Sequence, residues 1–369
     1  MRIAYISLHW PRTSDDGVGK KIMRQIEAWR EAGHEVVLYT HMHAYSGGGQ
    51  LLPAERFVYT ETHGPFGRVT TEISRSIALH KLLSKVKAFR PDLIYLRWGI
   101  YAFPLERLCR IAPTVMEINT NDVAQHRFLG KSIDTYNRLT RGIILKRVAG
   151  LVTISGELGR LPEFAGYRRP TRAIGNGYNL AGILPLPAPN NGRPHLAFLG
   201  SPRNPWHGVD KLVGLANRFP DLIVDVVGYD ELPGMGPLPD NLVLHGYLKS
   251  TDYVRVLATA DASMGSLALH RTGMIEGSPL KTYECLAYGL PMVLAYRDTN
   301  LDDLDCDFLL KLPNCEDNIQ THASQIYDFV TRMSGRRAEL SLVGPRIDDR
   351  LKEKERLKFF REILSTPLR

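Results

Sequence analysis

Two carboxylates flank a short segment in the last third of the chain, and their spacing suggests an anion site between two hydroxyl-binding groups. The segment reads Glu-Gly-Ser-Pro-Leu-Lys-Thr-Tyr-Glu, from Glu276 to Glu284. A carboxylate accepts charge-assisted hydrogen bonds from hydroxyls but repels a phosphate. One acid on each side of a phosphate-binding element would therefore suit a ribose on one side and a sugar on the other.

A helix is expected to begin between these acids. Ser278 suits the N-cap, Pro279 the first helical position and Gly289 the end, and Pro291 prevents continuation. The first amides of a helix lack partners within it and lie at the positive end of the helix dipole, which favours a phosphate or diphosphate. We expect these amides to belong to Gly277, Ser278, Leu280 and Lys281.

With its closing Ala-Tyr-Gly-Leu-Pro, the segment resembles the Glu-x7-Glu signature of retaining glycosyltransferases with the GT-B fold, family 4 in particular. The resemblance implies that Glu276 is a catalytic residue that contacts the donor sugar and that Glu284 binds the ribose. It also implies two Rossmann-like, doubly wound domains facing across a cleft. The alternative for an isolated Glu-x7-Glu pattern is an ordinary capped helix with two surface acids.

A glycine loop near the amino terminus is the second candidate segment. Gly17 and Gly19 follow the first strand-like run and open a helical pattern, where small residues allow a ligand to approach the backbone. In the resembled family this loop faces the donor diphosphate and the acceptor. A tight strand-to-helix turn explains the loop about as well.

The third segment, residues 198–211, departs from the family pattern. The family commonly has an arginine and a lysine here, and this chain has Ser201 and His207 in their places. Arg203, Lys211 and Lys281 remain as candidate cations for the departing diphosphate, and His207 could donate a hydrogen bond to it. The sequence assigns the role to none of them, and a packing role for His207 is equally compatible with it.

A further departure lies at Asn119, which stands where many relatives have a histidine near the reacting sugar. An amide can hold a hydroxyl but cannot titrate as a base near neutral pH. We take Asn119 as a second candidate catalytic residue, with Glu117 or Asp122 as the acids that could supply a base. A loop with turn-forming residues is the alternative.

The elements that must position these residues follow one pattern twice, because short apolar strands alternate with amphipathic helices in both halves. This pattern is typical of parallel sheets covered on both faces. The predicted strands are 2–7, 35–41, 93–98, 114–118 and 151–155 in the first series, and 195–200, 222–228, 242–245, 262–269 and 291–296 in the second.

Length and composition agree with two domains, because 369 residues with 44% hydrophobic content exceed one typical domain. A stretch rich in proline separates the two series. We predict an acceptor-binding domain at 1–182, a linker at 183–194, a nucleotide-sugar-binding domain at 195–345 and, from the resemblance, a helix at 346–369 returning to the first domain.

Several classes of protein are disfavoured. No run reaches membrane-spanning length, and the four cysteines lack the spacing of a zinc site or a disulfide framework, so we expect a reducing cytoplasm. The net charge of +8 is compatible with anionic lipid, nucleotide phosphate or no charged partner. One hypothesis is peripheral contact with the inner face of a membrane through basic helical stretches around Lys81, Lys85 and Lys87 or around Arg138 and Arg141, and a solvated helix face is the alternative for either stretch. No nucleic-acid-binding module is evident.

The sequence thus predicts a retaining glycosyltransferase that moves a hexose from a UDP- or GDP-sugar to a glycan or lipid-linked acceptor, in polysaccharide or glycolipid assembly. No cofactor and no metal are expected, because no Asp-x-Asp motif is positioned after a strand to chelate a metal between diphosphate oxygens. The nearest acidic cluster, Asp302-Asp303-Leu304-Asp305, lies beyond the strand at 291–296 and is interpreted as a turn. The alternatives are a sugar-nucleotide epimerase on the same scaffold and an inactive sugar-nucleotide-binding subunit.

Overall fold

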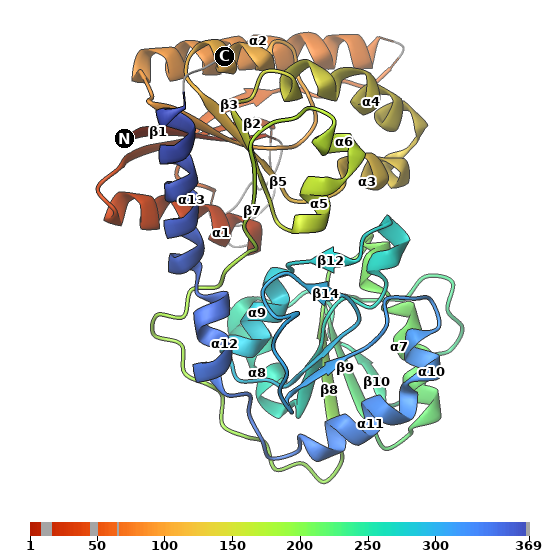
Figure 1. The fold of residues 1–369 in the computed structure, drawn as a ribbon. Coiled ribbons are helices and arrows are strands. Elements are labelled where there is room, and N and C mark those ends of the chain that lie inside the picture. The colour runs from red at the N-terminus through yellow and green to blue at the C-terminus, as the bar shows by residue number, and fades with distance from the viewer. Residues whose placement is uncertain (9–16, 45–50, 65, 367–369) are drawn as a thin grey trace. The chain divides into compact units, whose positions relative to one another are not determined.

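The computed structural model describes residues 1–8, 17–44, 51–64 and 66–366 and divides the chain into two compact units (Figure 1). The first unit comprises Met1–Ile174 and Asp349–Arg369, and the second comprises Gly175–Asp348. Residues 183–194 belong to the second unit, where Arg337 donates to the carbonyl oxygens of Leu186 at 3.0 Å and Pro187 at 2.8 Å.

The first unit is built on a seven-stranded sheet in the order β3-β2-β1-β4-β5-β6-β7, with every pair parallel. Its strand order reverses between β1 and β4, and in open parallel sheets ligands gather at the carboxyl ends of strands at such a point. The strands are β1 (Arg2–Leu8), β2 (Glu35–His43), β3 (Glu55–Tyr59), β4 (Leu93–Arg97), β5 (Thr114–Ile118), β6 (Gly150–Thr153) and β7 (Thr171–Ala173).

The helices of the first unit cover this sheet (Figure 1). They are α1 (Gly17–Glu31), α2 (Gly67–Phe89), the 3-10 helix η1 (Leu105–Arg110), α3 (Asp122–Leu129), α4 (Lys131–Leu145), α5 (Gly156–Arg160), α6 (Pro162–Ala165) and α13 (Asp349–Ser365). The carboxy-terminal α13 packs beside α1, where Phe360 contacts Trp29 edge-on at 5.3 Å between ring centroids. The Trp29 indole also donates to Glu353 at 2.8 Å, so the last helix is part of this core.

The second unit has a six-stranded parallel sheet in the order β10-β9-β8-β11-β13-β15, which reverses between β8 and β11, and a separate strand pair, β12-β14. The strands are β8 (His195–Leu199), β9 (Ile223–Val227), β10 (Leu242–Leu244), β11 (Ala262–Met264), β12 (Glu276–Gly277), β13 (Met292–Leu294), β14 (Arg297–Asp298) and β15 (Leu309–Lys311). The helices are η2 (Pro205–His207), α7 (Asp210–Arg218), α8 (Ser250–Thr259), η3 (Leu269–Thr272), α9 (Leu280–Ala287), α10 (Asn318–Thr321), α11 (Ala323–Arg332) and α12 (Leu340–Ile347).

All ten predicted strands are present, most of them shortened by a few residues, and both series form parallel sheets. Their continuous apolar runs reflect burial on both faces of a sheet. The short strands β3, β7, β12, β14 and β15 were missed. In the described part of the chain, no helix is long and apolar enough to span a membrane.

Candidate active site

Helix α9 begins at Leu280, and Pro279 is its cap residue, so the predicted cap at Ser278 is wrong. The buried Ser278 hydroxyl has other partners, because it accepts the Asn176 amide at 2.8 Å and lies 2.6 Å from the Tyr283 hydroxyl. Pro279 has an extended backbone, with ψ of 129°, and therefore stands before the helix. These partners, and not a backbone amide of the first helical turn, use the Ser278 hydroxyl.

This start narrows the set of amides offered to an anion. Leu280 and Lys281 hold the first helical positions, where backbone N–H groups have no partner within the helix. Gly277 instead lies in β12, where its carbonyl accepts the Thr299 amide at 2.9 Å. Leu280 and Lys281 are therefore the predicted amides that lie within the first turn of α9.

The two signature acids lie on different elements, Glu276 in β12 and Glu284 within α9. Glu284 Oε1 accepts the hydroxyl of Tyr178 at 3.0 Å and that of Tyr253 at 2.6 Å. Burial, and then the charge of Glu284, raises the pKa of both tyrosines, so both remain donors at neutral pH. Glu284 Oε2 makes no hydrogen bond with any described residue, which leaves one oriented oxygen for a ligand hydroxyl.

Lys281, on the first turn of α9, has a buried ammonium without a hydrogen-bond partner among the described residues. Its Nζ lies 4.2 Å from the ring centroid of Phe198, a residue of β8. Burial lowers the pKa of Lys281 to about 7. A buried charge normally has an ionic or hydrogen-bonding partner in the protein, and this one has only an aromatic face.

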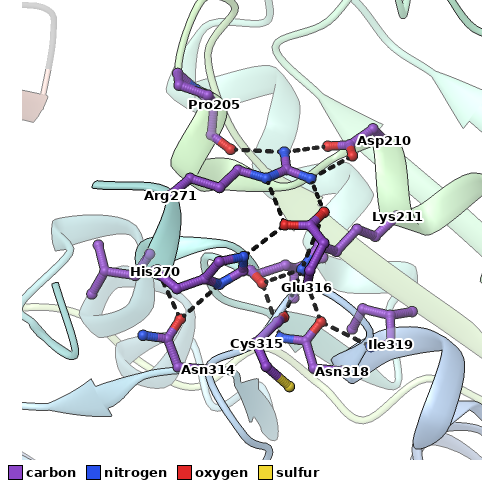
Figure 2. Close-up of polar contacts among 12 residues, drawn as sticks. Pro205, Asp210, Lys211, His270, Arg271, Asn314, Cys315, Glu316, Asn318 and Ile319 are labelled. Carbon is purple, nitrogen blue, oxygen red and sulfur yellow. Dashed lines mark hydrogen bonds and ion pairs between the residues drawn. The ribbon is translucent and has the colours of Figure 1, made fainter. Parts of the chain in front are cut away.

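Lys211 is the opposite case, as Figure 2 shows. Its Nζ donates to the carbonyls of Leu267 at 3.1 Å and Cys315 at 2.9 Å, and to Asn318 Oδ1 at 3.1 Å. An ammonium has three N–H donors, and all three are used. Lys211 therefore links α7 to the segments that contain Leu267 and Cys315, and it has no N–H group left for a diphosphate.

The loop between β8 and α7 carries Ser201, Arg203 and His207. His207 is buried, and its Nδ1 lies 3.0 Å from the Tyr229 hydroxyl and 3.4 Å from the Ser201 amide. Burial and the neighbouring charge of Lys281 hold the pKa of His207 well below its usual range, so the ring is neutral. Arg203 is exposed and forms no ion pair with a described residue.

A polar network around Arg271 and Glu316 links the segments that follow β8, β11 and β15 (Figure 2). Arg271 donates to both carboxylate oxygens of Asp210, at 2.9 and 2.7 Å, and to the Pro205 carbonyl at 3.1 Å. It also pairs with Glu316, which lies 2.7 Å from His270 Nε2, and hydrogen bonding from Arg271 lowers the pKa of Glu316 to about 2. His270 and Arg271 are therefore bound to protein partners and brace the loops after β8 and β11.

In the first unit, Asn119 lies beside a buried charge cluster at the carboxyl ends of the central strands. Glu117 is fully buried and lies 2.9 Å from Lys21, 3.1 Å from Arg97 and 3.7 Å from Arg356. Burial alone would raise the pKa of Glu117, but these three cations outweigh it and hold that pKa well below its usual range. Glu117 is therefore unsuited to act as a base.

Asn119 accepts a hydrogen bond from Lys21 through Oδ1 at 3.0 Å. Its Nδ2 is buried and has no hydrogen-bond partner among the described residues, so this amide retains a donor. Nearby, Gly17 begins α1 and Gly19 is buried in its first turn, whereas residues 14–16 of the glycine loop lie outside the described residues.

Asp122, the other acid considered as a base, is committed to structure. Arg141 holds both its oxygens, at 2.8 and 2.9 Å, and Asn137 donates to it at 2.8 Å. Arg141 is buried by this pairing, so its predicted contact with a membrane is wrong. The described residues contain no group of three or more His, Cys, Asp or Glu side chains able to hold a metal ion.

Residues 16–177 match the family model of the glycosyl transferase 4-like domain. No curated protein matches the chain by sequence.

Solved structures share the fold over nearly the whole chain. One is a sucrose-phosphate synthase from Thermosynechococcus elongatus, with a TM-score of 0.65 and 15% identity over 99% of both chains. Another is the lipopolysaccharide outer core galactosyltransferase WaaB, with a TM-score of 0.66 and 11% identity over 98% of this chain and 100% of that chain. HepE of Anabaena, solved with UDP and glucose, has a TM-score of 0.62 and 13% identity over 97% and 99%.

Proposed function

Because residues 16–177 belong to the glycosyl transferase 4-like domains and the whole chain has the GT-B fold, we propose that this protein is a retaining glycosyltransferase. The premise agrees with the predicted family resemblance and fold class. In the proposed reaction a hexose passes from a UDP- or GDP-sugar to an acceptor hydroxyl, without a metal or another cofactor.

One observation carries the proposal, namely the arrangement of Glu284 on α9. Its Oε1 accepts two tyrosine hydroxyls while its Oε2 makes no hydrogen bond with a described residue. Glu284 lies about one helical turn after Leu280 and Lys281, whose amides lack partners within the helix. A fixed carboxylate beside an anion-binding helix start suits a ribose diol next to a diphosphate. Glu276, before the same helix, is proposed to bind the donor hexose.

The proposed mechanism relies on electrostatic stabilisation of the leaving group. The bond between the anomeric carbon and the diphosphate oxygen breaks, and the acceptor oxygen bonds to that carbon on the same face. The leaving diphosphate oxygen takes the acceptor proton. Negative charge grows on the diphosphate as the bond breaks, so helix amides and a nearby cation stabilise the transition state more than the substrate. Asn119 is proposed to hold a hydroxyl of the sugar or acceptor through its Nδ2.

Donor binding and product analysis test this proposal. A native-state ligand raises apparent stability, so a thermal-shift panel of nucleotide sugars should identify the donor. NMR of the product should then show a retained anomeric configuration, with equal rates in the presence and absence of EDTA. An inverted product, or activity abolished by EDTA and restored by magnesium or manganese, would overturn the mechanism. Donor binding without transfer or hydrolysis would instead indicate a binding subunit, and an epimerised donor would indicate an epimerase.

The acceptor is proposed to be a glycan or a lipid-linked molecule met at the inner face of a membrane, in polysaccharide or glycolipid assembly. The outer face of α2 supports this, because Val69, Ile73 and Ile77 are each more than half exposed at helical spacing. Further along the same helix, Lys81 and Lys87 are exposed. An apolar patch continued by basic side chains suits a surface of anionic lipid.

Liposome flotation tests the membrane contact. Vesicles containing anionic lipid should carry the protein at low salt and release part of it at high salt, because salt screens the basic side chains. Replacing Ile73 and Ile77 by Ser should weaken binding at both salt concentrations. No flotation at low salt would rule the contact out.

A further inference from the structure

We propose that Lys281 is the cation that meets the donor diphosphate, and that it takes up a proton when the donor binds. This inference rests on the proposed function, because it concerns the same donor site. It assigns to one residue a role that the sequence left open among three.

Lys281 lies at the start of α9, next to the loop that follows β8. It stands on the first turn of α9, so its side chain begins where the unpartnered helix amides lie. Its Nζ faces the Phe198 ring at 4.2 Å, and Phe198 is in the strand that leads into the loop of Ser201 and His207. The ammonium is close enough to His207 to lower the pKa of that ring.

The ammonium of Lys281 has no hydrogen-bond partner among the described residues. Nζ is buried and makes no hydrogen bond to any described residue, whereas Lys211 has all three donors engaged. Arg203 is exposed on a loop, where water screens its charge. A buried ammonium without a partner is costly unless something compensates it, and a diphosphate at the helix start would do so.

This placement also accounts for the residues that this chain lacks. Ser201 and His207 occupy positions where the resembled family commonly has cations. His207 is neutral, so it cannot replace the lost charge. Lys281 reaches the same loop from α9, and the positive charge is thereby supplied from the helix.

Burial makes this cation sensitive to pH. The pKa of Lys281 lies near 7 because burial disfavours the charged form, and the titratable groups facing it are His207 of η2 and Cys285 of its own helix. Burial raises the pKa of the Cys285 thiol to about 12, so both neighbours stay neutral between pH 6 and 8. A bound diphosphate would favour the protonated lysine and raise its pKa.

The sign of the pH effect follows from linkage. The donor binds best to protonated Lys281, so affinity is full below pH 7 and falls as the pH rises through the pKa of the empty site. The affinity should therefore decrease between pH 6 and pH 8, and binding at pH 8 should be accompanied by proton uptake.

Titration calorimetry with UDP-glucose and GDP-mannose as probes measures the donor affinity at pH 6 and pH 8. Repeating the titration in buffers of different ionisation enthalpy measures the proton uptake. Lys281→Met should weaken binding at pH 6 by about tenfold or more and abolish the proton uptake at pH 8. Lys281→Arg should bind without proton uptake, because an arginine stays charged. Lys249→Met, which removes an exposed lysine of the same unit, is the matched control and should behave as the native protein.

Stability supplies a readout that a merely structural lysine would not give. Removing an uncompensated buried amine should raise the melting temperature of the ligand-free protein, so Lys281→Met should gain stability while it loses donor affinity. Native donor affinity in Lys281→Met, or proton uptake that persists in it, would overturn this inference and leave the proposed function standing. Native protein that binds neither probe would overturn both.

Discussion

Two buried charges, Glu117 in the first unit and Lys281 in the second, have opposite surroundings. In the first unit, Glu117 is surrounded by Lys21, Arg97 and Arg356, and Arg356 also pairs with Glu353. In the second unit, Lys281 is buried beside an aromatic ring with no acidic partner among the described residues. Both clusters contact loops at the carboxyl ends of parallel strands or the start of a helix, where open sheets bind ligands.

By this difference, the charge of Glu117 stabilises the fold, whereas the charge of Lys281 is proposed to bind a ligand. A buried pair that is satisfied internally resists disruption, because removing one member leaves the other without compensation. A buried charge with no partner is a local cost, and proteins retain such costs mainly at functional sites. The comparison therefore predicts a large stability loss when Glu117 is replaced and a loss of ligand binding when Lys281 is replaced.

The largest effect is expected from Glu117→Ala. The change leaves Lys21 and Arg97 buried without their shared partner, and should lower the free energy of unfolding of the first unit by about 3–5 kcal/mol. Urea unfolding followed by fluorescence measures it. The exposed pair Arg24–Glu27 provides the control, because Glu27→Ala should cost less than about 1 kcal/mol. Equal losses in the two variants would contradict the distinction between these charges.

The next effect falls on turnover in the second unit. Glu276→Gln keeps the side-chain shape but weakens charge-assisted hydrogen bonds to the donor sugar, so turnover should fall about 100-fold, or ~2.7 kcal/mol in the barrier. The melting temperature should stay near the native value, which separates this loss from misfolding. Near-normal turnover would remove Glu276 from the site.

The sequence could predict the elements better than the partners of their side chains. Apolar runs on both faces defined strands such as β1 and β8, and Gly289, with φ of +82°, ends α9 as predicted. Local capping rules failed at Ser278, because its hydroxyl is used by Asn176, which lies 102 residues away in the chain. Propensity describes neighbours in sequence, and this contact is set by the tertiary fold.

The candidate site shows the same limit. The sequence ranked Lys211 and Lys281 equally, because both are lysines near helix starts. Only the structure distinguishes them, through the contacts of Lys211 with Leu267, Cys315 and Asn318. The predicted domain boundaries at 182/183 and 345/346 remain predictions, beside compact units that divide at 174/175 and 348/349.

Two lysine variants of the second unit compare an ammonium that has three hydrogen-bond partners with one that has none among the described residues. Lys211→Met would remove three hydrogen bonds, at a cost of about 1–3 kcal/mol in unfolding free energy. The Leu267 carbonyl and Asn318 Oδ1 would keep their second donors, whereas the Cys315 carbonyl would lose its hydrogen bond from Lys211. Lys281→Met should change stability in the opposite direction. Differential scanning calorimetry of both variants without ligand measures the signs. Stabilisation by Lys211→Met would show that a full set of hydrogen bonds does not mark a structural lysine.

The smallest effect is expected from Glu284→Ala. Glu284 accepts hydrogen bonds from two neutral tyrosine hydroxyls. Tyr178 and Tyr253 orient Glu284, so its loss removes one proposed pair of hydrogen bonds to the ribose, remote from the reacting carbon. Donor affinity should fall about tenfold, or ~1.4 kcal/mol, with little change in turnover at saturating donor.

A tyrosine variant tests whether the orientation of the Glu284 carboxylate contributes to donor affinity. Tyr253→Phe keeps the Glu284 carboxylate but removes its 2.6 Å hydrogen bond, so donor affinity should fall by less than in Glu284→Ala. Titration calorimetry with the donor and steady-state kinetics separate affinity from turnover in both variants. Because Tyr178 and Tyr253 stay protonated donors over this range, the loss in both variants should be the same at pH 6 and pH 8. A pH-dependent loss, or a turnover defect with native affinity, would show that Glu284 acts on the leaving diphosphate and not on the ribose.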